Sequence, residues 1–476
     1  MTLAVADWLI IAGYFVLTAV ISFAFVRRGS RSLEDYFVSG RSLPWWLAGT
    51  SMVATTFAAD TPLAVTGMVA AHGVAGNWLW WNMVMSGILT VFFYARLWRR
   101  AEVVTDAEFA EIRYAGRPAA FLRGFRALYL ALPINLIVMG WVNLAMVKIL
   151  GVTFGFDPWI SLFVLFLITA AYSAVSGLWG VVVTDFVQFG LAIAGSIVLA
   201  YFAIAEVGGM DGLRAGLAAR YGSAEPMLSV LPPVGAAWLP AITLFVYLGV
   251  QWWAAWYPGA EPGGGGVVAQ RIFAARTERE GVLATLWFNV AHYAIRPWPW
   301  ILVALSSLVL YPGLADPSTG YVRAMVELLP TPLKGLMLAS FAAAYMSTIS
   351  SQLNWGASYL VNDIYLRFIS RESTERGRVM VSRLATLVLF ALSALVTTQL
   401  TTIEGAWKLL IAMGAGTGLV FILRWYWWRI NAWSEISAML ASLVATLVLQ
   451  GLFGLDSADP REFALLMLTT VGFSTV

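Results

Sequence analysis

A row of hydroxyl side chains lies in the middle of a long uncharged segment of this chain. Residues 343–358 read AAYMSTISSQLNWGAS, and no charged residue occurs between Lys334 and Asp363. On a helix turning about 100° per residue, one sector holds Ser340, Ala344, Ser347, Thr348, Ser351 and Ser358. Hydroxyl and carbonyl oxygens are hard ligands that suit Na⁺, and the Ala344 carbonyl lies one turn from the Thr348 hydroxyl. The stripe therefore indicates one wall of a cation site, although close helix packing also uses small residues and hydroxyls.

A second segment supplies oxygens that one helix lacks. Residues 58–67 read AADTPLAVTG, which places Asp60 and Pro62 inside an apolar stretch. Proline has no N–H, so the carbonyl four residues earlier, that of Ala58, loses its helical partner. The break and the hydroxyl stripe together favour a cation site over simple packing.

A third segment cannot form one continuous helix. Residues 256–271 read WYPGAEPGGGGVVAQR, and the glycines expose backbone groups close to Glu261. Glu261 either pairs with Arg296 or meets an amine or a hydroxyl of a solute. Charges inside membrane segments are costly and usually functional. We therefore predict a substrate or coupling site that contains Asp60, Glu261, Gly263, Gly264 and Arg296.

The composition requires a membrane around these segments. The 476 residues are 60% hydrophobic and only 12% charged, and apolar stretches of bilayer length recur along the whole chain. There is no cysteine, and the two histidines, His72 and His292, lie far apart in the sequence. A thiolate nucleophile, a metal cluster or a Ser-His-Asp triad is therefore poorly supplied. We expect an all-α polytopic membrane protein that is not an enzyme.

About 13 membrane spans are expected from the apolar stretches. They lie at 7–26, 44–70, 77–97, 125–150, 158–176, 180–204, 237–275, 282–311, 333–361, 383–400, 404–423, 433–453 and 461–476. The last span stops short, so we expect it to be truncated. Most basic residues fall in alternate loops, which predicts that these loops are cytoplasmic and that the N-terminus lies outside the plasma (inner) membrane. The same distribution accounts for the basic charge without a nucleic-acid partner.

The two broken spans suggest an internal repeat. Span 44–70 starts inside and span 237–275 starts outside, and each leads a group of five spans, as in inverted-repeat transporters. We expect a single membrane domain, 1–476, in four parts. These are a first span with a cytoplasmic loop (1–43), a first repeat (44–204), a second repeat (237–423) and C-terminal accessory helices (433–476).

Three motifs carry a family resemblance. DYFVSGRSLPWWLAGTSMVATTFAADTP, GLWGVVVTDFVQ and AAYMSTISS followed by NDIY resemble the sodium:solute symporter family, with the same order and spacing. That family includes bacterial sodium/proline, sodium/galactose and sodium/sialic-acid transporters. The resemblance implies a LeuT-type fold and Na⁺-coupled uptake of a small solute.

The resemblance also implies ion-binding residues. A first Na⁺ site would consist of the backbone carbonyls of Ala58, Thr61 and Ala344 with the hydroxyls of Ser347 and Thr348. A second Na⁺ site, as in the sialic-acid transporter, would use Asp185, Ser350 and Ser351. The glycine-rich break departs from the family pattern, in which aromatic or amide residues are common there, so the resemblance does not identify the solute.

Together these features predict a Na⁺-coupled secondary active symporter that imports a small organic solute by alternating access. Its partners are Na⁺, the solute and the lipid bilayer. An ion channel, a membrane-embedded enzyme and a membrane sensor built on a transporter fold are the alternatives. Broken helices and buried acids without a selectivity-filter repeat favour the carrier. An amine or zwitterion and a sugar or carboxylate both remain open as the solute.

Overall fold

The described part of the chain is helical. The computed structural model describes residues 3–29, 32–173, 177–233, 235–254, 265–370 and 374–476. Within these residues the only bridge of strand type joins Leu43 to Ala275. The predicted all-α class is therefore confirmed.

The helices of the first half run from α1 to α14. They are α1 Val5–Gly29, α2 Leu33–Val38, α3 Trp45–Thr56, α4 Asp60–His72, α5 Trp78–Trp81, α6 Val84–Leu89, α7 Ala95–Arg100, α8 Phe109–Arg113, α9 Gly116–Tyr129, α10 Asn135–Phe154, α11 Pro158–Ser173, α12 Gly177–Glu206, α13 Gly209–Tyr221 and α14 Glu225–Leu228.

The helices of the second half run from α15 to α25. They are α15 Ala241–Gly249, α16 Gly266–Ala274, α17 Glu278–Asn289, α18 Pro297–Leu310, α19 Gly320–Leu328, α20 Leu333–Ser358, α21 Glu375–Thr397, α22 Ile403–Ala415, α23 Gly418–Leu423, α24 Ala432–Gly451 and α25 Pro460–Thr475. Four 3₁₀ segments join them: η1 Ser39–Arg41, η2 Val74–Asn77, η5 Gln251–Trp253 and η7 Pro317–Thr319. Four π-helical segments continue them: η3 Thr90–Tyr94, η4 Leu130–Ile134, η6 Val290–Ile295 and η8 Tyr359–Ile369.

Both predicted broken spans are discontinuous. The axes of α3 and α4 are bent by 58° at a short break. Pro62 lies in the first turn of α4, where backbone N–H groups lack helical partners in any case. The break therefore falls at residues 57–59, and it includes Ala58 as expected. In the second broken span, α15 ends at Gly249, η5 covers Gln251–Trp253 and α16 begins at Gly266, whereas residues 255–264 of the predicted glycine-rich break lie outside the described residues.

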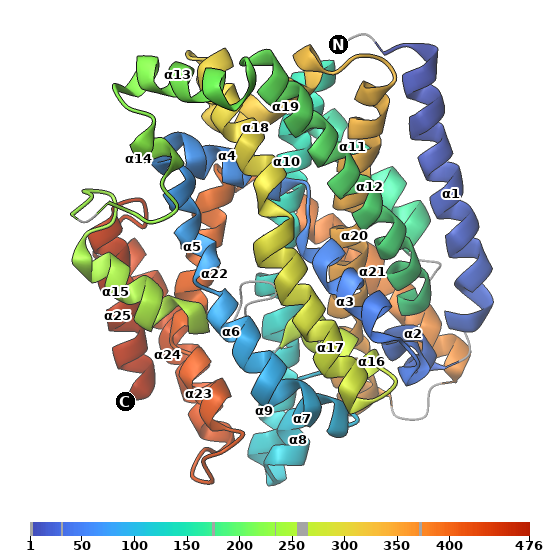
Figure 1. The fold of residues 1–476 in the computed structure, drawn as a ribbon. Helices are drawn as coiled ribbons and strands as arrows, with labels where there is room; N and C mark the ends of the chain where they lie inside the picture. The colour runs from blue at the N-terminus through green and yellow to red at the C-terminus, as the bar shows by residue number, and fades with distance from the viewer. Residues whose placement is uncertain (1–2, 30–31, 174–176, 234, 255–264, 371–373) are drawn as a thin grey trace.

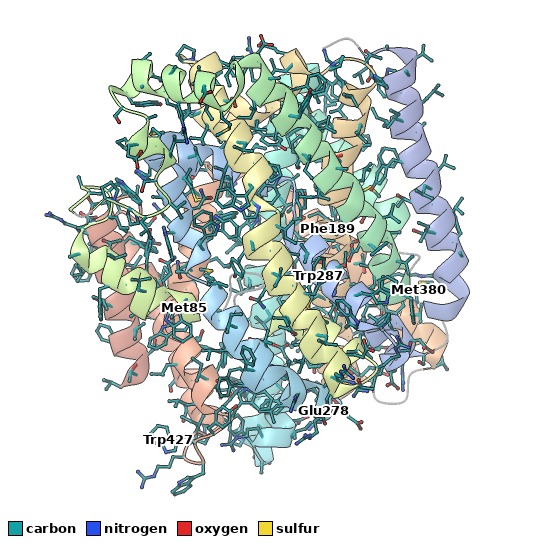
Figure 2. All side chains as sticks on the ribbon, viewed as in Figure 1. Met85, Phe189, Glu278, Trp287, Met380 and Trp427 are labelled. Carbon is teal, nitrogen blue, oxygen red and sulfur yellow. The ribbon has the colours of Figure 1, made fainter. Side chains whose placement is uncertain are left out.

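Several helices can cross a membrane. By length and composition, six of the described helices qualify, or up to eight if each bent pair is one span. The 26 residues of α20 are also long enough to cross a bilayer, but its hydroxyl side chains make it more polar than those six. Large apolar side chains cover the outside of the bundle. Met85 and Met380, both labelled in Figure 2, are among these exposed side chains, as expected of a surface in contact with lipid.

The helices form one bundle with two distinct ends. In Figure 1, α13 lies across the upper end, and α8 lies at the lower end. Within the bundle, α12 packs against α20, α3 and α1. This packing brings the α3–α4 break, the middle of α12 and the hydroxyl stripe of α20 together.

Candidate ion and solute site

The hydroxyl stripe of α20 meets the break between α3 and α4. Thr348 Oγ1 donates a hydrogen bond to the Thr55 carbonyl at 2.8 Å and to the Ala344 carbonyl at 3.2 Å. At the break, the Thr61 N–H donates to the Ala58 carbonyl at 3.2 Å. Ala58, Thr61 and Thr348 line one small cavity. The structure thus brings together three of the five residues predicted for the first Na⁺ site. A fourth, Ala344, is linked to them because its carbonyl accepts a hydrogen bond from Thr348.

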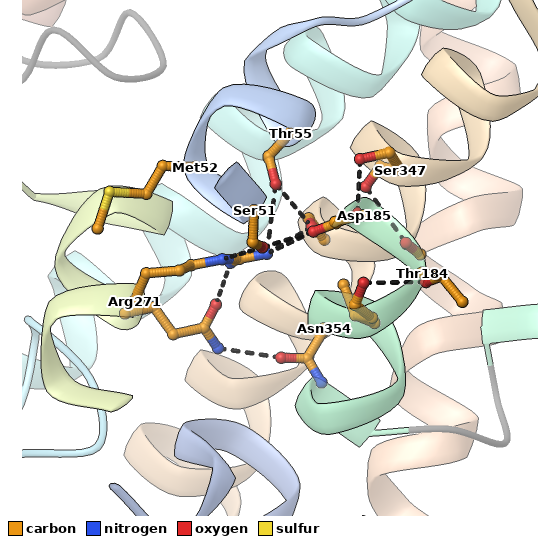
Figure 3. Close-up of polar contacts among 12 residues, drawn as sticks. Ser51, Met52, Thr55, Thr184, Asp185, Arg271, Ser347 and Asn354 are labelled. Carbon is orange, nitrogen blue, oxygen red and sulfur yellow. Dashed lines mark hydrogen bonds and ion pairs between the residues drawn. The ribbon is translucent and has the colours of Figure 1, made fainter. Parts of the chain in front are cut away.

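Ser347, the fifth residue of that predicted site, turns toward α12. Its Oγ donates to Asp185 Oδ1 at 2.6 Å (Figure 3). The other carboxylate oxygen, Oδ2, accepts from Ser51 Oγ of α3 at 2.5 Å. Asp185 of α12 is therefore linked to α3 through the Ser51 hydroxyl and to α20 through the Ser347 hydroxyl. Ser347, predicted for the first Na⁺ site, is thus in contact with Asp185, which is predicted for the second.

An arginine occupies the space beside Asp185. Arg271 Nη2 of α16 lies 3.7 Å from Asp185 Oδ2, and both side chains are completely buried. The same nitrogen donates to Ser351 Oγ at 2.6 Å and to Thr55 Oγ1 at 3.3 Å. Arg271 is therefore not a loop cation, because α16 continues past it to Ala274 and holds it inside the bundle.

The guanidinium is held from its other side as well. Arg271 Nε donates to Ser51 Oγ at 3.1 Å, and Nη1 donates to Gln270 Oε1 at 2.8 Å. Gln270 in turn donates to Asn354 Oδ1 of α20 at 3.0 Å, as Figure 3 shows. Each side of the arginine fork thus has an oxygen partner, which is the condition for burying such a cation.

The residues of the predicted second site have different surroundings. Asp185 and Ser351 both contact the Arg271 guanidinium. Ser350 Oγ instead donates to the Ser347 carbonyl of its own helix at 3.2 Å. The structure thus brings two of the three predicted residues to one point, and a cationic side chain already lies there.

Two of the predicted substrate residues, Asp60 and Arg296, lie at the level of the break. Asp60 is the first residue of α4 and lines the same cavity as Thr348. Arg296 Nη1 donates to Thr56 Oγ1 at 3.3 Å, and Arg296 Nη2 lies 3.2 Å from His292 Nε2. The guanidinium also lies over the rings of Phe57 and Trp300. Glu261, Gly263 and Gly264 lie outside the described residues.

Some site residues carried no clear signal in the sequence. Ser51 and Thr55 are ordinary hydroxyl residues of a helix, and only their contacts with Arg271 and Asp185 give them a role. His292 lines the cavity and lies 2.9 Å from Thr56 Oγ1 through Nδ1. The spacing of residues along one helix could not predict these site residues, because their partners lie on other helices.

The comparisons with known proteins fit this geometry. A profile of the sodium:solute symporter family matches residues 36–444. The chain belongs to the sodium:solute symporter family. The sodium/glucose cotransporter of Vibrio parahaemolyticus is 26% identical over 443 residues, which cover 88% of this chain and 80% of that protein. Sodium/glucose cotransporter 4 of Danio rerio is 25% identical over 490 residues, with 94% and 72% covered.

A solved structure has the same fold as this symporter. A Na⁺-coupled sialic acid symporter, solved in a substrate-bound outward-open state, superposes with a TM-score of 0.79 at 21% identity, over 99% of this chain and 97% of that one. The symporter is therefore an all-helical, multi-pass membrane protein with a LeuT-like fold. It is a sodium-coupled secondary transporter and not an enzyme. Sodium coupling requires that the protein bind Na⁺.

Proposed function

We propose that this symporter imports a small organic solute by alternating access, driven by Na⁺ bound where α20 meets the α3–α4 break. The observation that carries the proposal is the convergence of Thr348, Ala58 and Thr61 on one cavity. The ligands would be the carbonyls of Ala58, Thr61 and Ala344 and the hydroxyls of Ser347 and Thr348. All five are oxygen donors, the set that a hard cation prefers. Ser347 would turn from Asp185 to reach the ion.

The second Na⁺ site, at Asp185, Ser350 and Ser351, is also proposed. Asp185 is a buried carboxylate that accepts two hydroxyl hydrogen bonds, which is a suitable start for a cation site. An ion there would share the carboxylate with Arg271, since Nη2 already lies 3.7 Å from it. Occupancy of this site therefore depends on where the guanidinium lies.

The finer architecture is part of the same proposal. About 13 spans would be arranged as a first span with its loop (1–43), inverted repeats 44–204 and 237–423, and accessory helices 433–476. The discontinuity at the start of each repeat, α3–α4 and α15–α16, supports this division. The lower end in Figure 1, with α8, would face the cytoplasm, and the N-terminus would lie outside the plasma (inner) membrane. The loop arginines around α7 and α8 support that orientation.

The solute would bind beside the first ion site. Asp60 and Arg296 lie at the level of the break, and Glu261, Gly263 and Gly264 are proposed to belong to the same region from the sequence. Relatives are described as carriers of glucose and of sialic acid, so small polar solutes are the first class to test. The partners are then Na⁺, one such solute and the surrounding lipid, without nucleic acid.

A ligand screen tests the proposal. Purified protein is heated with and without NaCl, at constant ionic strength, in the presence of amino acids, sugars, carboxylates or nucleosides. We expect Na⁺ alone to raise the melting temperature and one solute class to raise it further only with Na⁺. Counterflow of the labelled solute in proteoliposomes then separates a carrier from a channel, because only a carrier exchanges solute. A melting temperature that ignores Na⁺ contradicts the proposed ion site.

A further inference from the structure

Asp60 has an unused hydrogen-bonding atom inside the bundle. The residue is 2% exposed, and its Oδ1 has no hydrogen-bond partner among the residues that the structure describes. Its position at the start of α4, the Trp407 side chain and the nearby Arg296 cation offer partial compensation for a negative charge. A buried carboxylate oxygen without a bonding partner is nevertheless costly. A ligand that supplies a positive charge and donor hydrogens removes this cost.

The cavity in front of Asp60 is small and has mixed walls. Its volume is about 30 Å³, which is room for one or two water molecules or for a headgroup of similar size. Gln352, on α20, lines the same cavity, and its Oε1 also has no partner among the described residues. Trp141 and Trp407 form an aromatic wall, with ring centroids 6.3 Å apart at 65°.

The lining distinguishes an organic cation from a bare metal ion. A metal ion needs a shell of several oxygens, and the proposed Na⁺ ligands, Thr348 among them, are a separate set from Asp60 Oδ1 and Gln352 Oε1, which are only two. An ammonium group carries up to three N–H donors, enough for Asp60 and Gln352. The side of the ammonium group that donates no hydrogen bond can lie against an indole ring, where cation–π attraction stabilises it. The two acceptor atoms and the aromatic wall therefore suit an ammonium group better than Na⁺.

We propose that Asp60 binds an ammonium group of the transported solute. The inference rests on the proposed function, because the solute has to reach this cavity during transport. It restricts the solute class to amines, amino acids or amino sugars, in place of neutral sugars. The Asp60 carboxylate neutralises the charge, the Gln352 amide accepts a second N–H, and the indole of Trp141 or Trp407 covers the exposed face.

The rest of such a solute has space on the neighbouring turn of α4. Leu63 and Ala64, about one turn beyond Asp60, line a second cavity of about 440 Å³. Lys148 and Asp316, which are paired at 2.8 Å, form part of its lining. Under this proposal the body of the solute would lie toward this larger cavity, because Leu63 and Ala64 follow Asp60 on the same face of α4.

Matched probes test the inference on the full chain. Methylammonium is the headgroup probe, with KCl as the control for ionic strength. Glucosamine is compared with glucose, and alanine with lactate, since each pair differs chiefly in one amino group. Melting temperatures are measured with Na⁺ present for wild type, Asp60→Asn, Asp60→Glu and the exposed control Asp211→Asn. We expect methylammonium and at least one amino compound to stabilise wild type and Asp211→Asn at concentrations where the neutral partner does nothing.

The variants decide between the outcomes. Asp60→Asn is expected to weaken the response to the ammonium probes at least tenfold, and Asp60→Glu to retain part of it. In the absence of solute, both variants are expected to keep the Na⁺ shift of wild type. If Na⁺ stabilisation itself is lost in Asp60→Asn, Asp60 is an ion ligand and the ammonium proposal is overturned.

Wild-type results alone are also decisive. Equal responses to both members of each pair, or no response to any ammonium probe beyond that of KCl, overturn the ammonium proposal even if Asp60→Asn does not fold. A wild-type protein that is indifferent to Na⁺ contradicts the proposed function instead, so the two failures are distinguishable.

Discussion

Arg271 Nη2 lies 3.7 Å from Asp185 Oδ2, and neither side chain has contact with solvent. The pair joins α16, which follows the glycine-rich segment of the sequence, to α12. The same guanidinium holds Ser51 of α3 and Ser351 of α20. Movement of α16 away from α12 would have to break this pair, and a Na⁺ ion at Asp185 would have to compete with it. The ion pair therefore couples the second proposed Na⁺ site to the geometry of the bundle.

Breaking this pair should destabilise the protein strongly. Asp185→Asn leaves the Arg271 cation buried without its counter-charge, which typically costs about 3–5 kcal/mol. Asp185→Asn combined with Arg271→Met should recover much of the loss, because neither charge is then buried. The melting temperature without Na⁺ measures both effects. Glu404→Gln is the control, since the partly exposed pair of Glu404 and Lys408, 2.9 Å apart, should contribute less than about 1 kcal/mol.

Mutation of Asp185 should also change the number of Na⁺ ions that the protein binds. If it receives a second Na⁺, Na⁺ titration of the melting temperature in wild type should be cooperative, with a Hill coefficient above one. Asp185→Asn should lower the coefficient toward one and leave the first site intact. A coefficient of one in wild type would contradict the second Na⁺ site.

The hydroxyls of α20 should determine Na⁺ affinity. Ser347→Ala and Thr348→Ala each remove one proposed oxygen ligand, and we expect Na⁺ stabilisation to weaken at least tenfold, or about 1.4 kcal/mol. Ser382→Ala and Thr386→Ala are matched controls, because those hydroxyls bond to carbonyls within α21. Unchanged Na⁺ dependence in both α20 variants would remove the first-site assignment.

Lys148 should restrict access to the larger cavity. Lys148 Nζ is 2.8 Å from Asp316 Oδ2, in a partly exposed pair that joins α10 to the loop before η7. Because the chain has no cysteine, Ala64→Cys provides a unique label in this cavity. Adding Lys148→Met should speed modification of that thiol by a water-soluble reagent up to about fivefold, the effect of about 1 kcal/mol. Arg323→Met, which removes the Arg323–Glu327 pair within α19, should leave the rate unchanged.

Glu435 should anchor α24 to the bundle. Its carboxylate is buried, with Oε2 3.3 Å from Arg126 Nη1 and 3.2 Å from Arg424 Nη1. Glu435→Gln leaves two buried guanidinium groups with less negative charge nearby, and we expect a loss of about 3–5 kcal/mol in stability. Thermal unfolding measures this loss. Glu327→Gln, at an exposed pair on α19, should shift the melting temperature far less.

The sequence by itself determined the class of protein and where its helices break. Composition decides whether a chain can remain in water, so the low charge and the recurring apolar stretches were sufficient for a polytopic membrane protein. Pro62 acts on the backbone locally, so the α3–α4 discontinuity could be found without knowing any partner. The stripe of α20 hydroxyls likewise follows from helical periodicity alone.

Only the tertiary structure decided which groups meet across helices. Ser347 bonds to Asp185 across 162 residues of sequence, and Arg271 bonds to Ser51 across 220, so no local pattern contains either contact. Arg271 is the plainest case. Charge counting assigns an arginine to a loop because its isolated burial is too costly, but Asp185, Ser51, Ser351 and Gln270 supply the charge and the oxygens that make burial acceptable. Those partners come from three other helices and one adjacent residue, and only packing of the bundle brings them together.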